Sequence, residues 1–155
     1  MSVKPDMRNP VHFLAFGFGS GLSPKAPGTM GTLAALPLWY LLAQLPLAGY
    51  IAGLLLVIAV GPYLCGKTAR DLGVHDHGGI VWDEIAGFLL TMLLVPVSIW
   101  TALIGFALFR LFDIVKPWPI GWLDKHVHGG TGIMLDDLVA ALYAGVCIQA
   151  LLWWW

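Results

Sequence analysis

The sequence predicts an all-α integral membrane protein that forms a single domain over residues 1–155. Hydrophobic residues make up 59% of the chain and charged residues only 11%, which is typical of a protein surrounded by lipid. The stretches 26–66, 85–109 and 138–155 contain no charged residue, and a membrane-crossing helix needs about 20 mostly apolar residues. We therefore expect about five membrane-crossing helices, including two hairpins. The formal net charge of -1 offers no basic surface, so we expect no nucleic-acid partner.

The first uncharged stretch predicts a helical hairpin. Its clearest turn signal is the Gln-Leu-Pro-Leu-Ala-Gly segment at 44–49, so one arm is expected at about 29–45 and the other at about 48–65. Pro37 should bend the first arm. Residues 11–22, ahead of the hairpin, are too few and too rich in glycine to cross a membrane. We expect them to form a short interfacial or re-entrant segment.

The second uncharged stretch has two interpretations. Residues 85–112 could form one long tilted helix, which would separate Asp83 from Asp137 by the whole bilayer. They could instead form a hairpin that turns near 95–98 and brings both acids to one face. We favour the hairpin, although it draws charged side chains below the membrane surface, where they must face one another, a metal ion or water.

A last helix is expected from about Met134 to the three tryptophans at 153–155, whose indole rings suit a membrane interface. With five crossings, every Lys and Arg falls on one side of the membrane. The positive-inside rule then makes that side cytoplasmic. The protein is thus expected to be a multi-pass membrane protein with its polar segments facing the cytoplasm.

A loop rich in glycine and hydroxyl side chains, residues 17–32, precedes the first hairpin. Such a loop can direct backbone N–H groups and the positive end of a helix toward an anion such as phosphate. The side chains that could add donors are Ser20, Lys25, Thr29 and Thr32. The alternative is structural: Thr29 would only cap a helix, and the glycines would only permit close packing.

Two pairs of adjacent acids stand at the starts of apolar helices: Asp83 with Glu84, and Asp136 with Asp137. Side by side, they would supply the oxygen ligands that Mg²⁺ or Mn²⁺ prefers, without any need for Cys or His. Taken singly, each pair could be explained by the favourable field at a helix N-terminus. Four histidines lie in the flanking loops, and the sequence assigns them no role: His75, His77, His126 and His128.

Arg110, Asp113 and Lys116 recur at every third residue, so one helical face carries positive, negative and positive side chains. An ion pair between Arg110 and Asp113 that reaches the lipid headgroups could explain these two residues. Lys116 is less easily explained in that way, because Pro117 ends the helix and leaves its ammonium group available to a phosphate.

Taken together, these segments resemble the phosphatidylglycerophosphatase A family of bacterial membrane enzymes. The resemblance runs from about Gly17 to Tyr143. It is carried by the Gly-Ser-Gly and Pro-Gly-Thr elements of the first loop and by the motifs Val-Trp-Asp-Glu at 81–84, Phe-Arg through Lys-Pro-Trp-Pro-Ile at 109–120, and Gly-Ile-Met-Leu-Asp-Asp at 132–137. It implies a lipid phosphatase of the bacterial inner membrane that uses Mg²⁺ to hydrolyse phosphatidylglycerophosphate to phosphatidylglycerol and inorganic phosphate.

In the mechanism expected from these residues, the two acid pairs hold Mg²⁺, and Lys116 and Arg110 bind the phosphate together with the first loop. Asp113 or one of the four acids would deprotonate the attacking water, with an aspartyl-phosphate intermediate as the alternative. A second function stays open, namely a small cation transporter or channel subunit that uses the same buried acids. The oligomeric state is not predicted.

Overall fold

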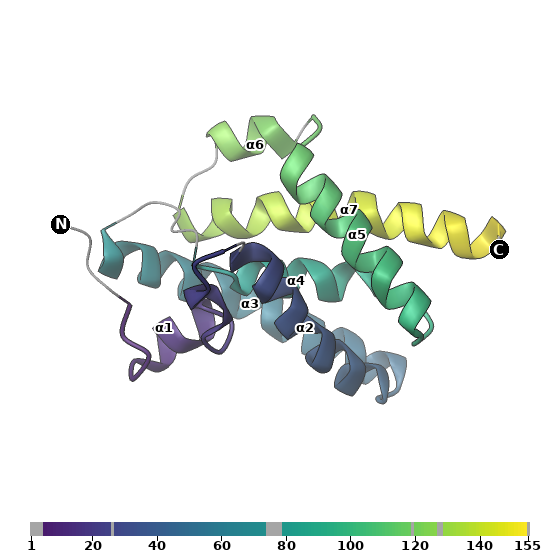
Figure 1. Ribbon diagram of the computed structural model, residues 1–155, viewed down its shortest axis with the longest axis horizontal. Helices are drawn as coiled ribbons and strands as arrows, with labels where there is room; N and C mark the ends of the chain where they lie inside the picture. The colour runs from purple at the N-terminus through teal and green to yellow at the C-terminus, as the bar shows by residue number, and fades with distance from the viewer. Residues whose placement is uncertain (1–4, 26, 74–78, 119, 127–128, 155) are drawn as a thin grey trace.

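The computed structural model describes residues 5–25, 27–73, 79–118, 120–126 and 129–154. These residues form helices and no strands, so the predicted all-helical class is confirmed for the described part of the chain. In chain order the elements are α1 (Pro10–Ala15), the short 3-10 helix η1 (Ser20–Leu22), α2 (Pro27–Ala43), α3 (Leu47–Leu72), α4 (Trp82–Thr91), α5 (Ile99–Val115), α6 (Ile120–His126) and α7 (Gly129–Trp154) (Figure 1).

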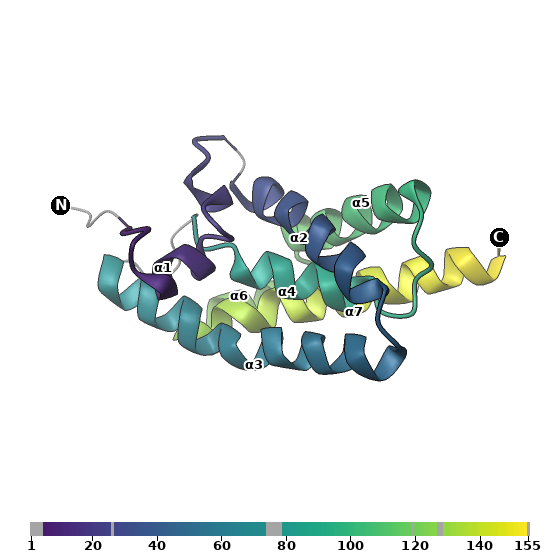
Figure 2. The same cartoon turned by 90° about the horizontal axis from the view of Figure 1, so that it is seen from below.

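Helices α3 and α7 are the two described helices that are long and apolar enough to cross a membrane. Each has 26 residues, which corresponds to about 39 Å at the rise of an α-helix. They lie side by side along the long axis of the molecule, and the chain ends at the far end of α7 (Figures 1 and 2). The other membrane-crossing helices of the expected five stay a prediction.

The first predicted hairpin corresponds to α2 and α3, which run in roughly opposite directions on either side of the turn at 44–46 (Figure 2). Helix α3 continues seven residues beyond the predicted end at Cys65. It ends at Gly73, which has φ 70° and donates its N–H to the carbonyls of Ala69 and Arg70. Glycine adopts this left-handed conformation without strain, and it therefore sets the end of the helix.

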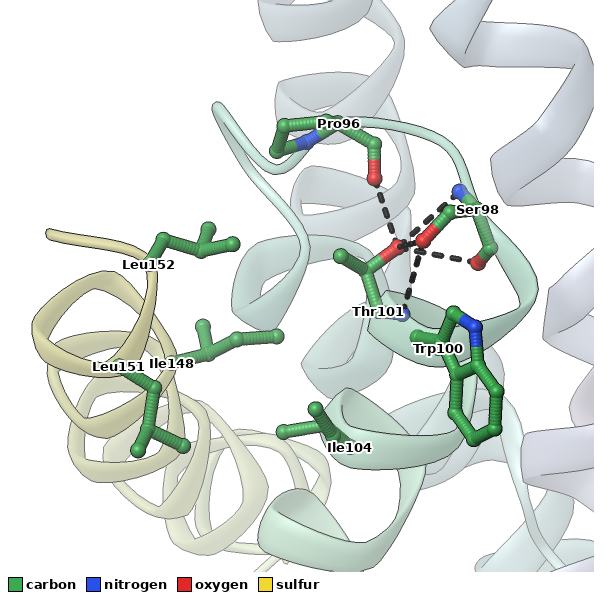
Figure 3. A pocket seen from close by; sticks show the side chains of 8 residues that line it. All are labelled: Pro96, Ser98, Trp100, Thr101, Ile104, Ile148, Leu151 and Leu152. Atoms are coloured by element: carbon green, nitrogen blue, oxygen red, sulfur yellow. Dashed lines mark hydrogen bonds between the residues drawn. The ribbon is translucent and has the colours of Figure 1, made fainter. Parts of the chain in front are cut away.

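The chain also reverses between α4 and α5, near the predicted turn at Pro96. Ser98 caps α5: its hydroxyl accepts the N–H of Thr101, and Thr101 Oγ1 accepts the N–H of Ser98 (Figure 3). The Thr101 hydroxyl also lies 2.7 Å from the carbonyl oxygen of Pro96. Helix α4 has ten residues, which reach about 15 Å. This is half of the roughly 30 Å of bilayer hydrocarbon, so α4 is too short to form a membrane-crossing arm of the predicted hairpin.

Helix α4 lies in the middle of the bundle, packed against α2, α3, α5 and α7. Eight of its ten residues are buried, and the ring of Phe88 meets Trp39 of α2 edge to face. The carbonyls near its end are paired by side chains from its neighbours. The hydroxyl of Tyr50 donates to Leu89 O at 2.6 Å, and Gln149 donates to Leu93 O at 3.1 Å. These bonds let a helix end inside an apolar bundle.

Two close backbone approaches fix where α7 lies. A Cβ atom added to Gly87 of α4 would lie 2.5 Å from the ring of Phe109 and 3.1 Å from Asp137 O. At the start of α7, a Cβ added to Gly130 would lie 1.9 Å from Pro62 O on α3. Glycine at these positions therefore lets α4 approach α5 and α7 closely and lets the start of α7 lie against α3.

The N-terminal segment does not span the bundle. Helix α1 has six residues, and η1 has three. The segment is joined to α4 through the N–H of Val81, which donates to Ala15 O at 2.8 Å. A segment too short to cross was predicted for residues 11–22, and its place at a membrane interface stays a prediction.

Candidate metal and phosphate site

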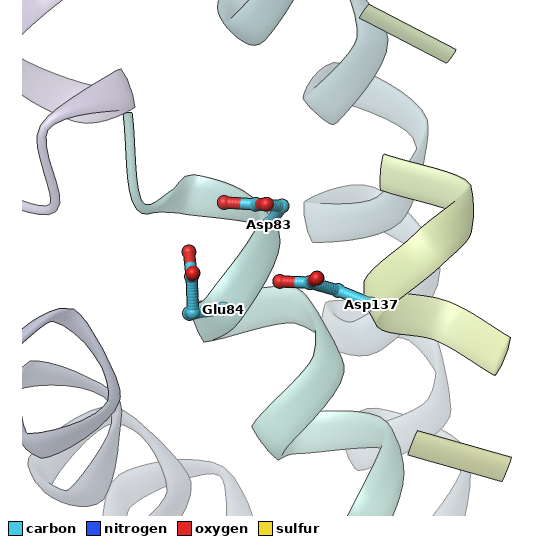
Figure 4. Close-up of side chains that lie close together, drawn as sticks. All are labelled: Asp83, Glu84 and Asp137. Atoms are coloured by element: carbon cyan, nitrogen blue, oxygen red, sulfur yellow. The ribbon is translucent and has the colours of Figure 1, made fainter. Parts of the chain in front are cut away.

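Three carboxylates from two helices meet in the interior of the bundle. Asp83 and Glu84 lie in the first turn of α4, and Asp137 lies two turns into α7. One oxygen of each lies within 4.8 Å of one oxygen of each of the others. Figure 4 shows the three side chains converging from the two helices. Asp83 and Asp137 are only 7% and 3% exposed, so bulk water cannot stabilise these charges.

Each of these acids has a buried oxygen without a hydrogen-bond partner among the described residues: Asp83 Oδ1, Glu84 Oε2 and Asp137 Oδ2. A cation close to such a buried carboxylate oxygen would stabilise its charge. The donor set consists of oxygen, which is typical of sites for hard divalent ions such as Mg²⁺, Mn²⁺ or Ca²⁺. These residues therefore fit a divalent metal ion.

A row of alternating charges runs along α5 beside the three acids. Arg110 Nη1 contacts Asp113 Oδ2 and lies 3.8 Å from Glu84 Oε1. Lys116 Nζ lies 3.9 Å from Asp113 Oδ1 at the end of the helix. Lys116 is the C-cap residue, with φ 52°, and Pro117 follows it, so the helix ends where the sequence predicts.

One cavity of about 250 Å³ is lined by side chains from α4, α5 and α7. It brings together seven residues that the sequence predicted to be functional: Asp83, Glu84, Arg110, Asp113, Lys116, Asp136 and Asp137. Three isoleucines complete the lining. The two acid pairs line one cavity, as expected, and the interpretation of 85–112 as one continuous helix is wrong because α4 ends at Thr91 and α5 begins at Ile99.

Asp136 differs from the other three predicted metal ligands. It is buried and lines the same cavity, but the group of acids within mutual reach of one ion consists of Asp83, Glu84 and Asp137. Neighbouring residues of an α-helix point about 100° apart, so Asp136 and Asp137 present their carboxylates in different directions.

The first loop contributes less to this cavity than expected, since Ser20, Lys25, Thr29 and Thr32 are not among its lining residues. The Ser20 hydroxyl donates to Gly17 O at 2.7 Å, and the buried Thr32 hydroxyl donates to Gly28 O at 2.8 Å. Both hydroxyls thus bond to nearby carbonyls of their own segment. Lys25 is exposed, and a phosphate-binding role for these four residues stays a prediction.

Gly28 is the residue of this segment that approaches the charged row. A Cβ added there would lie 3.1 Å from Glu84 Oε1 and 3.2 Å from Arg110 Nη1. The sequence analysis did not single out Gly28. The available signal was its place in the first turn of a helix directly after a proline, where backbone N–H groups have no partner within the helix.

The histidines take no part in the cavity as far as the chain is described. His75, His77 and His128 lie outside the described residues, and His126 stacks on Trp122. His12, which sequence reasoning missed, is buried, and its Nε2 lies 3.0 Å from Asp71 Oδ2. This contact joins α1 to α3.

Comparison with known proteins identifies the relatives of the chain. The family described as Phosphatidylglycerophosphatase A matches residues 13–152. A protein named phosphatidylglycerophosphatase A from Escherichia coli (strain K12) is 56% identical over 137 residues, covering 88% of this chain and 80% of the relative. Another of the same name from Haemophilus influenzae is 46% identical over 153 residues, covering 97% of this chain and 94% of the relative. No solved structure matches the chain significantly.

Proposed function

Because this chain belongs to the phosphatidylglycerophosphatase A family, we propose that it hydrolyses phosphatidylglycerophosphate to phosphatidylglycerol and inorganic phosphate. The observation that carries the proposal is a cavity in which the carboxylates of Asp83, Glu84 and Asp137 lie beside Arg110 and Lys116. Acids that hold a metal ion and cations that hold a phosphate are the two components that phosphate-ester hydrolysis requires. The relatives favour this function over the cation transporter.

The protein is proposed to lie in the bacterial inner membrane, with α3 and α7 crossing it and the cavity facing the cytoplasm. Two features support this placement. Large hydrophobic side chains are exposed on the bundle, such as Leu56 of α3 and Val146 of α7. Lys67 and Arg70 lie in the last turns of α3, whereas the exposed Trp153 and Trp154 lie at the end of α7, which is at the opposite end of the molecule (Figure 1).

Asp83, Glu84 and Asp137 would hold the metal ion, which we propose to be Mg²⁺, with Mn²⁺ as a substitute. Asp136 lines the same cavity and would accept hydrogen bonds from the water around the ion. When bound, such an ion neutralises phosphate charge and makes water a stronger nucleophile.

The other residues act on the substrate itself. Arg110 and Lys116 would bind the oxygens of the terminal phosphate, and Asp113 keeps both cations in place through its two oxygens. The oxygen of a water molecule forms a bond to phosphorus as the bond from phosphorus to the glycerol oxygen breaks. Asp113 or one of the four acids takes the proton of the water, and the glycerol oxygen leaves as a hydroxyl once protonated. A carboxylate that attacks phosphorus directly is the alternative route.

The direct test uses the purified full-length protein in detergent with phosphatidylglycerophosphate as substrate. We expect release of inorganic phosphate with added Mg²⁺ and no release with excess chelator. Folded protein that releases no phosphate under any of these conditions would refute the proposal and favour the transporter.

A further inference from the structure

A groove between α2 and α5 is lined only by hydrophobic side chains. Its volume is about 240 Å³, and the lining residues are Leu33 and Leu36 of α2 with Ile99, Ala102, Leu103 and Phe106 of α5. The two helices diverge as they leave the charged row, which Figure 2 shows in side view. Several lining side chains are largely exposed, including Ile99 and Leu103, so the groove opens to the outside of the bundle.

Each wall of the groove leads to a polar residue at the end near the cavity. On α5, Leu103 and Phe106 are followed by Arg110 at helical spacing, so all three lie on one face. On α2, Leu33 and Leu36 are preceded by Thr29 at the same spacing. A Cβ added to Gly28 would lie 3.2 Å from the Arg110 guanidinium, so the two helices meet at this end.

The groove lies within the depth of one leaflet when it is measured from Arg110. Phe106 and Ile99 lie four and eleven residues before Arg110, which corresponds to about 6 Å and about 16 Å along α5. One leaflet contributes about 15 Å of hydrocarbon. A lipid whose phosphate is bound at Arg110 would therefore have an acyl chain at the depth of the groove.

We propose that this groove binds one acyl chain of the lipid phosphate monoester whose phosphate occupies the neighbouring cavity. The inference rests on the proposed function, because it assumes that the phosphate of the lipid is bound at Arg110.

Another apolar pocket lies where the loop after α4 meets the end of α7 (Figure 3). It lies on the α7 side of α5, and its lining residues Thr101 and Ile104 are not at helical spacing from Arg110, so it is not aligned with the charged row.

The test fills the groove and measures selectivity for chain length. Ala102→Phe places a ring in the groove, and Ala59→Phe is the matched control, because Ala59 is exposed on α3, which does not line the groove. The measured quantity is kcat/KM for dioleoyl-phosphatidylglycerophosphate divided by kcat/KM for the dibutyryl lipid. We expect A102F to lower this ratio by about tenfold, since the loss of two buried methylene groups already weakens binding by about that factor. A59F should leave the ratio at the wild-type value.

An unchanged ratio in folded A102F would overturn the inference while leaving the proposed function intact. If the wild-type protein hydrolyses neither lipid, the proposed function itself fails. A second measurement needs no variant: the wild-type protein is labelled with a phosphatidylglycerophosphate whose acyl chain carries a diazirine. Labelling of peptides from 29–36 and 99–106 supports the inference. Labelling confined to other helices overturns it. If these peptides are not labelled and Leu103→Cys instead forms disulfide-linked dimers, a second copy of the chain covers the groove, which also overturns the inference.

Discussion

Arg110 of α5 lies 3.8 Å from Glu84 of α4, measured from Nη1 to Oε1. This contact connects the two halves of the cavity, because Glu84 also belongs to the three acids that fit a metal ion. The guanidinium simultaneously contacts Asp113 on its own helix. The proposed metal-binding and phosphate-binding residues are thus joined through one side chain, and we expect a change at Arg110 to affect both functions.

Arg110→Lys is expected to lower kcat/KM for phosphatidylglycerophosphate by about 10–100-fold. A lysine keeps the charge but cannot contact Glu84, Asp113 and a phosphate at once, and a hydrogen bond to a charged group contributes about 1.5–3 kcal/mol. Steady-state phosphate release measures the effect. Arg70→Lys is the matched control, because Arg70 is exposed and does not line the cavity. Equal activity of R110K and wild-type protein would remove Arg110 from the proposed site.

Asp137→Asn and Asp136→Asn provide a matched pair of adjacent substitutions. Asp137 belongs to the group of three acids and Asp136 does not, so D137N should lose at least about 100-fold in activity and D136N markedly less. Binding is measured separately, as the rise in unfolding temperature when Mg²⁺ is added. At a Mg²⁺ concentration of 100 times Kd, binding stabilises a protein by about 2.7 kcal/mol. The corresponding rise in unfolding temperature should disappear in D137N. The opposite ranking of the two variants would assign the metal ion to Asp136.

Gly87→Ala should destabilise the protein by about 1–3 kcal/mol, because the added methyl group meets the ring of Phe109 and the carbonyl of Asp137. Gly145→Ala is the control on α7. Its Cβ would lie 3.7 Å from Thr91 O, which is an ordinary contact, so its stability should change little. Thermal unfolding in detergent compares the two variants. A stable G87A would mean that α4 and α5 can move apart without cost.

The orientation in the membrane can be tested with single cysteines at Lys125 and Trp153 in intact cells. We expect a membrane-impermeant maleimide, added outside, to label Trp153→Cys and to spare Lys125→Cys until the cells are opened. Cys65 and Cys147 are replaced by serine beforehand, and this parent variant serves as the background control. Labelling of Lys125→Cys in intact cells would contradict a cytoplasmic cavity.

The meeting of α4, α5 and α7 at one charged cavity could be predicted from the sequence, because ionised side chains in an apolar chain must face one another. The distinction between Asp136 and Asp137 could not be predicted. It depends on the rotation of α7 about its own axis, which is fixed by the approach of Gly130 to Pro62 on α3. Sequence periodicity gives no information about such a contact between distant residues.

The end of α4 was also beyond sequence reasoning, because residues 85–95 are uniformly free of charge. The helix ends at Thr91, and Leu94 then adopts a left-handed conformation with φ 63°. The bond from Gln149 to Leu93 O comes from α7, far along the chain. The roles of Ser20 and Thr32 were uncertain for a related reason. A hydroxyl near a helix start can bond to its own backbone or to a ligand, and the residue type is the same in both cases.

Helix α4 carries two of the three acids that fit a metal ion and is enclosed by protein on nearly every face. In a bilayer it would have almost no contact with lipid, whereas α3 and α7 expose large apolar side chains and exceed the hydrocarbon thickness by about 9 Å. Those two helices can tilt to match membranes of different thickness. The internal helix would have no such requirement, so we expect its acids to keep one arrangement in bilayers of different thickness.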